Sequence, residues 1–111
     1  MAVISFVSAD SWFVPKYEFR TLLEKAALYA TDPDDQYALR QAIYMDGLHF
    51  QLKSSEETRR LAFAVEHAAD ELQAELAGNS NADQRDRQFS EALDVLKERL
   101  HGPGAVTGDH D

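Results

Sequence analysis

Four stretches of this chain place apolar residues at the 3.6-residue spacing of an α-helix, and each is bounded by residues that start or stop helices. The expected helices cover residues 15–31, 32–47, 54–78 and 84–101. A chain of 111 residues is long enough to bury one hydrophobic core without support from disulfides or metals. The sequence therefore predicts a mainly α fold, a compact four-helix domain over residues 1–101.

Local signals mark the ends of the first two expected helices. Pro15 favours the first turn of a helix, and Asp10 or Ser11 upstream is a candidate cap. The second helix opens at Asp32, a preferred N-cap residue that is followed by proline and two more acids. We expect Gly47 to end that helix, because glycine adopts the left-handed conformation of a helix C-terminus at little cost.

The last two expected helices carry signals of the same kind. Ser54 and Glu57 have the spacing of a capping box, and Gly78 ends the third helix. One apolar stripe repeats along the fourth helix and is expected to face the core: Phe89, Ala92, Leu93, Leu96 and Leu100.

Two short stretches depart from the helical spacing. Residues 48–53 alternate apolar and polar side chains, and residues 2–7 are rich in residues that favour strands. We therefore expect a minor two-stranded β ribbon between these stretches, packed on the helices because an isolated ribbon is unstable. Residues 102–111 show no periodicity and are predicted to form a flexible C-terminal tail.

The charge of the chain is distributed unevenly. The formal net charge is -9, yet residues 1–31 hold equal numbers of acidic and basic side chains. Residues 54–77 hold six acidic side chains against two arginines. Such a surface repels nucleic acid and anionic membranes, so we expect neither as a partner and favour a basic protein.

The composition excludes further classes of protein and site. The chain has no cysteine, which excludes disulfides, zinc–thiolate sites and thiol catalysis. Its first residues lack the basic segment and apolar core of a secretory signal, and no apolar run approaches the roughly 20 residues that span a bilayer. We expect a soluble, cytoplasmic protein.

Signatures of catalysis and metal binding are scarce. The chain has no glycine-rich phosphate loop, no nucleophile elbow and no His-Glu-x-x-His motif. His67 and Glu71 have helical spacing and could bridge a metal, but known helical carboxylate sites draw ligands from several helices. Asp109, His110 and Asp111 could chelate a metal only weakly. We predict no catalytic residue, no cofactor and no metal site, and a protein that is not an enzyme.

One aromatic residue falls on the charged side of the third expected helix. Phe63 lies about 160° from the centre of the apolar arc, so it needs cover from another element of the chain or from another molecule. Trp12 is a further aromatic candidate, for which we favour the core over an interface. The candidate partner-binding residues are Trp12, Phe63, Glu66, His67, Asp70 and Glu71.

These features support three hypotheses about function. The first is a small acidic protein–protein interaction module, in one version an inhibitor or immunity-type protein that neutralises a basic partner. The alternative is a homodimer, a structural or accessory protein without catalytic activity that buries second apolar stripes on its first and third helices. The third is a small-ligand binder or enzyme with a pocket between helices near Tyr37, Tyr44 and His49.

Overall fold

The computed structural model describes residues 1–8, 10–81 and 83–101, and the expected tail, residues 102–111, lies outside this part of the chain. Within the described residues the elements follow in the order β1 (Ala2–Ser5), β2 (Ser11–Val14), α1 (Lys16–Tyr29), α2 (Pro33–Met45), β3 (Gly47–His49), the 3-10 helix η1 (Phe50–Leu52), α3 (Ser55–Ala77) and α4 (Gln84–Leu100). The prediction of a mainly α fold with four helices is confirmed.

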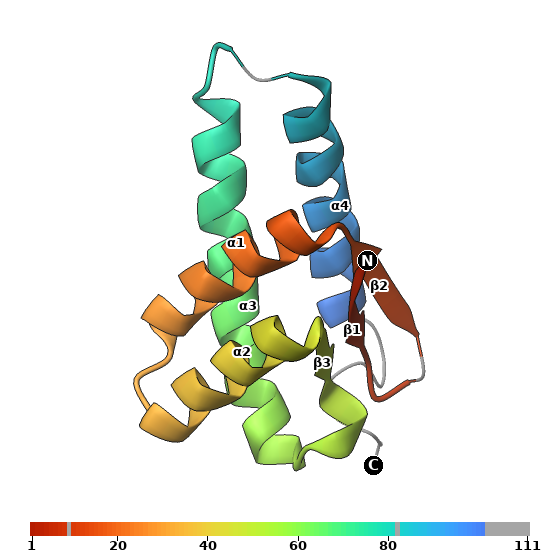
Figure 1. Ribbon diagram of the computed structural model, residues 1–111, viewed down its shortest axis with the longest axis vertical. Helices are drawn as coiled ribbons and strands as arrows, with labels where there is room; N and C mark the ends of the chain where they lie inside the picture. Colours follow the sequence, from red (N-terminus) through yellow and green to blue (C-terminus); the bar gives the residue numbers. More distant parts are fainter. Residues whose placement is uncertain (9, 82, 102–111) are drawn as a thin grey trace.

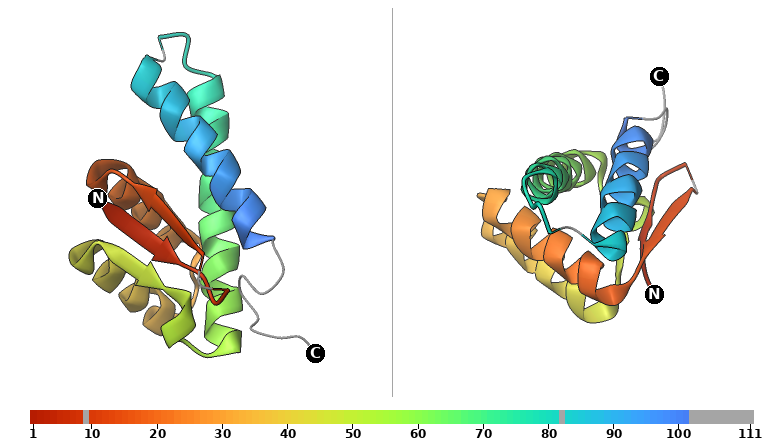
Figure 2. Two further views of the ribbon diagram at one scale, coloured as in Figure 1. Left: turned by 90° about the vertical axis from the view of Figure 1, so that its right-hand side faces the viewer. Right: turned by 90° about the horizontal axis from the view of Figure 1, so that it is seen from above.

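The helices form two pairs that cross each other (Figure 1). α3 and α4 make a long antiparallel hairpin, and α1 and α2 lie side by side across α3. Seen from above, α1 and α2 cover one flank of α3, while the sheet lies beside α4 (Figure 2). α1 therefore contacts both α2 and α3, and the outer side of the α1–α2 pair remains at the surface.

The three strands form one sheet in the order β2-β1-β3. β1 is antiparallel to β2, which places Ile4 opposite Trp12, and parallel to β3, which places Ile4 beside Leu48. These three side chains are buried, whereas Phe13 on the other face of β2 is 60% exposed. The expected pairing of the N-terminal strand with the segment near Leu48 is present, and β2 adds a third strand that the sequence analysis had not included.

β3 is shorter than the strand expected over residues 48–53. It ends at His49, and the chain continues as η1. The carbonyl oxygen of Phe50 accepts a hydrogen bond from the Thr58 hydroxyl at 3.3 Å, which ties this turn to the start of α3. The Phe50 ring is fully buried and lies 6.0 Å from the ring of Phe6. The turn that buries Phe50 thus takes the place of further strand pairing.

The prediction that Gly47 caps α2 was wrong. Asp46 takes the left-handed conformation instead, with a φ of 58°, and Gly47 opens β3. Glycine suits this position for a different reason, because a Cβ atom there would lie 2.7 Å from Nε2 of His49. The small residue after α2 therefore serves the packing of the sheet rather than the helix end.

The prediction of a cap for α1 at Asp10 or Ser11 was also wrong. Ser11 is the first residue of β2, and Pro15 occupies the N-cap position of α1. The carbonyl oxygen of Asp10 accepts the amide of Phe6 at 2.8 Å within the turn between β1 and β2. Pairing with β1 therefore places residues 11–14 in a β-hairpin instead of at the start of a helix.

The N-caps expected for α2 and α3 are present, although among the described residues only the Ser54 half of the predicted capping box is formed. The Asp32 side chain accepts the amide of Asp34 at 2.8 Å, and the Ser54 hydroxyl accepts the amide of Glu57 at 3.1 Å. The apolar stripe of α4 also faces the core, with Ala92 partly buried and the other four residues buried. Short-range signals were therefore sufficient to place these elements.

Two buried carboxylates connect the helices. Glu18 of α1 accepts two hydrogen bonds from the Arg85 guanidinium of α4, at 2.5 and 3.0 Å, and these hold the pKa of Glu18 below its ordinary value. Asp35 of α2 accepts two from Arg60 of α3, at 2.8 and 3.1 Å. Bidentate pairing of this kind fixes orientation as well as distance, so it sets how α1 and α2 lie against the α3–α4 hairpin.

Candidate functional site

Three rings form an aromatic ladder on the surface of α1 and α3: Tyr29, His67 and Phe63. The rings of Phe63 and His67 lie 4.2 Å apart, and those of His67 and Tyr29 lie 5.5 Å apart and stacked. Phe63 is 62% exposed and Tyr29 is 40% exposed. The expectation that Phe63 lies outside the apolar arc of its helix is confirmed. Its side chain rests on His67 and is otherwise open to an incoming molecule.

Carboxylates on α3 that the sequence singled out pair with residues at the end of α4. Glu66 lies 2.6 Å from Nε2 of His101, and Asp70 accepts from Nζ of Lys97 at 2.8 Å. α3 and α4 run side by side, which brings residues about thirty positions apart into contact. Part of the acidic charge expected on α3 is therefore compensated by α4.

Glu71 joins the aromatic ladder to a second ion-pair cluster. It accepts hydrogen bonds from the Tyr29 hydroxyl and from Lys25, whose ammonium nitrogen lies 3.2 Å away. Lys25 also contacts Glu75 at 2.9 Å. The Tyr29 hydroxyl and the Lys25 ammonium lower the pKa of Glu71, and the carboxylates of Glu75 and Glu71 raise the pKa of Lys25. These contacts join α3, which carries Glu71 and Glu75, to α1, which carries Lys25 and Tyr29.

The surface around the ladder remains acidic despite these pairs. Four carboxylates of α3, those of Glu66, Asp70, Glu71 and Glu75, lie near the ladder together with Lys25, Lys97 and Arg59, which lies one helical turn before Phe63. Lys25 and Lys97 are largely covered, so these pairs stay in place and the free carboxylate oxygens around them are what an incoming cation would meet. The ladder is thus an exposed aromatic strip bordered by carboxylates.

Trp12 does not belong to this surface. Its side chain is only 3% exposed, and the indole N–H donates a hydrogen bond to the carbonyl oxygen of Ala92 at 2.8 Å. Alternation along β2 turns Trp12 inward and Phe13 outward. Its candidacy as a partner-binding residue was therefore wrong, and the core position that we favoured is the one observed.

A metal is not favoured at His67 and Glu71 in this arrangement. The His67 ring is stacked on Tyr29 and tilted against Phe63, and Glu71 accepts hydrogen bonds from Tyr29 and Lys25. Over the part of the chain that the structure describes, no cluster of three or more potential metal ligands occurs. The chelating tail residues, positions 109–111, lie outside the described residues.

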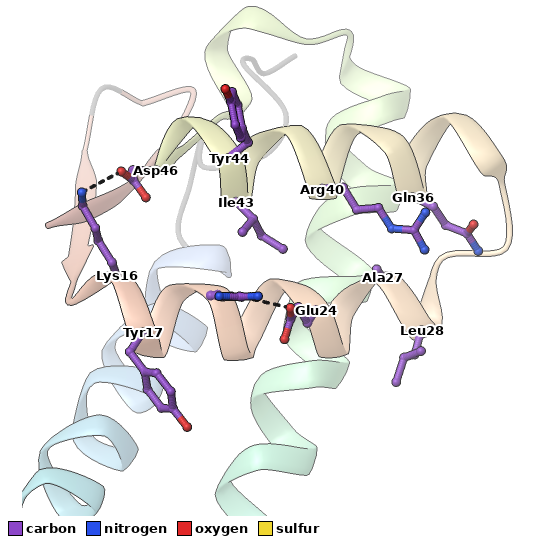
Figure 3. Close-up of a pocket in the computed structure, with 11 residues that line it drawn as sticks. Lys16, Tyr17, Glu24, Ala27, Leu28, Gln36, Arg40, Ile43, Tyr44 and Asp46 are labelled. Atoms are coloured by element: carbon purple, nitrogen blue, oxygen red, sulfur yellow. Dashed lines mark hydrogen bonds and ion pairs between the residues drawn. The ribbon is translucent and has the colours of Figure 1, made fainter.

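A second surface feature is an open groove of about 1060 Å³ between α1 and α2. Figure 3 shows Ile43 pointing into the space between the helices, with Tyr44 and Leu28 on opposite flanks. Tyr44 is 84% exposed and Leu28 is 82% exposed. At one end, Nζ of Lys16 lies 3.1 Å from the Asp46 carboxylate and links the two helices. Two members of the second stripe expected on the first helix, Tyr17 and Leu28, are exposed and line this groove, whereas its third member, Thr21, does not.

The pocket expected near Tyr37, Tyr44 and His49 is not formed as predicted. Tyr44 lines the groove, but Tyr37 points elsewhere on α2, where its hydroxyl accepts from Gln41 at 2.9 Å. His49 lies in β3, 3.1 Å from the Ser5 hydroxyl. Arg40, which the sequence analysis did not single out, lines the groove instead. Its side of α2 faces α1 only because the two helices pack together, which no short-range signal reveals.

Comparisons with known proteins identify no relative of this chain. Searches of protein-family models, curated proteins and solved structures found no match to this chain. Among the helices that the structure describes, none has the length and apolar character needed to cross a membrane.

Proposed function

We propose that this protein is an interaction module that binds a basic protein through the aromatic ladder. The exposure of Phe63 supports this proposal. Phe63 is a large apolar side chain among charged residues, and it is 62% exposed. Exposed aromatic residues that project from a polar surface are frequent anchors of protein interfaces.

The carboxylates around the ladder favour a cationic partner. Arginine or lysine side chains of the partner can approach the faces of Phe63 and Tyr29 while pairing with the neighbouring acids. The net charge of -9 would attract such a partner before contact and speed its association. In the sharper version of the proposal, the protein is an inhibitor of the immunity type and covers the basic active surface of its target.

The proposal assigns no catalytic role to the site. Glu71 pairs with Tyr29 and Lys25, Asp70 with Lys97 and Glu66 with His101, so these carboxylates are engaged in contacts that position α3. The function we propose is therefore binding, with the chemistry left to the partner.

The test compares two single variants of the exposed surface. Wild type, Phe63→Ala and the control Tyr44→Ala would be used to capture proteins from a lysate of the cells that make the protein. We expect a basic protein to be retained by wild type and by Tyr44→Ala, and to be lost with Phe63→Ala. Retention that is equal for all three proteins would contradict the proposal.

The purified partner then allows a test of charge steering. We expect the association rate to fall about tenfold or more between about 50 and 500 mM salt, because the long-range attraction is screened. An association rate that does not change with salt would remove electrostatic steering from the mechanism.

A further inference from the structure

We propose that the groove between α1 and α2 binds a small organic anion, a molecule that carries a carboxylate or phosphate group on an apolar body. The groove lining holds three basic side chains, those of Lys16, Arg20 and Arg40, against the two carboxylates of Glu24 and Asp46. This local excess of positive charge contrasts with the formal net charge of -9 for the whole chain. The groove is therefore a place where an anion meets a favourable charge on an acidic protein.

The unmatched positive charge of the groove belongs to Arg40. Nζ of Lys16 lies 3.1 Å from the carboxylate of Asp46, and Nε of Arg20 lies 3.1 Å from that of Glu24, so each carboxylate of the lining already has a cation from the same chain. Among the residues that the structure describes, Arg40 takes part in no ion pair. Figure 3 shows its side chain in the space between the two helices. A free guanidinium fork of this kind is suited to bidentate pairing with a carboxylate or phosphate.

Arg20 offers a second guanidinium from the opposite helix. Its contact with Glu24 uses Nε alone, so the two terminal nitrogens have no partner within the described chain. Both side chains of this pair are largely exposed and lie one helical turn apart on α1, and pairs of this type contribute little to stability. The Arg20 side chain can therefore turn towards a ligand at small cost, which makes guanidinium groups from both helices available to one anion.

The groove is held open by contacts at its two ends. At one end Lys16 pairs with Asp46, and near the other the side-chain amide of Gln36 donates to the Ala30 carbonyl oxygen at 2.8 Å. Between them Ile43 points into the space between the helices and offers apolar contact to the body of a ligand (Figure 3). The volume of about 1060 Å³ is close to the upper end of the range for small-molecule sites, so the groove has room for such a ligand.

This site is separate from the one in the proposed function. The lining of the groove includes no member of the aromatic ladder. The two ligands also carry opposite charge, since the ladder is proposed to bind a basic protein and the groove an anion. Each proposal can therefore fail without the other.

Titration of the purified protein with four small probes, followed by the NMR shifts of its backbone amides, tests the inference. Phenyl phosphate and benzoate carry the two anionic groups, benzyl alcohol keeps the ring without the charge, and inorganic phosphate keeps the charge without the ring. We expect the better of the two aromatic anions to bind with a Kd of about 1 mM or lower, and the two partial probes to bind at least about tenfold more weakly. The amide shifts should centre on Arg20, Arg40 and Ile43 and leave Phe63 unchanged.

Two exposed arginines provide the matched variants, Arg40 in the groove and Arg59 on α3. Neither forms an ion pair within the described chain, and replacement by glutamine changes the net charge equally. Arg40→Gln should weaken binding of the anion about tenfold or more, whereas Arg59→Gln should change its Kd less than about twofold. Circular dichroism would verify that both variants keep the helical content of wild type.

Three results would overturn the inference. The first is the absence of saturable binding by either aromatic anion up to about 20 mM. The second is an equal loss of affinity in Arg40→Gln and Arg59→Gln, because the general charge of the protein would then explain binding. The third is binding of benzyl alcohol as tight as that of the anions, which would show that the guanidinium groups take no part.

Discussion

Trp12 joins the sheet to α4, and replacement of Trp12 by phenylalanine tests this contact. The indole packs in the core with 3% of its surface exposed, and its N–H donates to the Ala92 carbonyl oxygen at 2.8 Å. Phenylalanine keeps an aromatic ring at this position on β2. It removes the hydrogen-bond donor and part of the apolar volume, so the substitution isolates the link between the two elements.

The expected cost of this substitution follows from two contributions. A hydrogen bond of this type adds about 1 kcal/mol to the free energy of unfolding. Phenylalanine also buries on the order of 50 Å² less apolar surface than tryptophan, which at about 25 cal/mol per Å² is about 1 kcal/mol. Trp12→Phe should therefore destabilise the protein by about 2 kcal/mol and lower its Tm by about 10 °C.

Urea unfolding measured by circular dichroism is the suitable assay, because Trp12 is the only tryptophan and its fluorescence is lost in the variant. Phe13→Ala is the matched control, since this neighbour on β2 is 60% exposed and should change stability by less than about 0.5 kcal/mol. A cost below about 0.5 kcal/mol for Trp12→Phe would refute the reasoning. An equal cost for both variants would show that the strand, and not the indole contact, carries the effect.

Two further predictions concern buried polar contacts. Because hydrogen bonds from Arg85 lower the pKa of Glu18, the pair stabilises the fold above the ordinary glutamate pKa of about 4.3, and this stability is lost as the pH falls through the lowered value. Glu18→Gln should flatten the fall of unfolding free energy with decreasing pH in this range, and an unchanged slope would count against the pair. Gly47→Ala should displace His49 from the Ser5 hydroxyl and cost about 1 kcal/mol. In a His49→Ala background the same change should be neutral or stabilising, and a cost that persists there would show that the backbone at Gly47 is responsible.

The candidate site was partly readable from the sequence. The angular position of Phe63 on its helix depends only on the residues next to it, so its exposure could be anticipated. The pairing of the nearby acidic side chains with lysines could not be anticipated. Glu71 meets Lys25 across 46 residues of sequence, and Asp70 meets Lys97 across 27. Such pairs exist only after the helices have packed, and they reduce the acidic charge that α3 presents.

The groove between α1 and α2 could not be predicted from the sequence either. The second stripe of α1 and the tyrosines of α2 were visible as residues, but a groove needs both helices at a defined distance and rotation. The ion pair of Lys16 with Asp46 links the two helices at one end, and Asp35 with Arg60, 25 residues apart, fixes α2 against α3. Neither helix alone indicates that Arg40 and Ile43 face α1.

What the sequence by itself determined were the four helices, their caps at Asp32 and Ser54, and the inward stripe of α4, because these depend on interactions within a few residues. What only the tertiary structure decided was the strand at residues 11–14, the burial of Trp12 and the role of Gly47. Trp12 depends on a carbonyl 80 residues away, and the close contact of Gly47 with His49 occurs in a strand that forms by pairing with β1, where Gly47 lies beside Val3. Local periodicity carries no information about such partners, so the sheet and both surfaces emerge only when the helices and strands pack together.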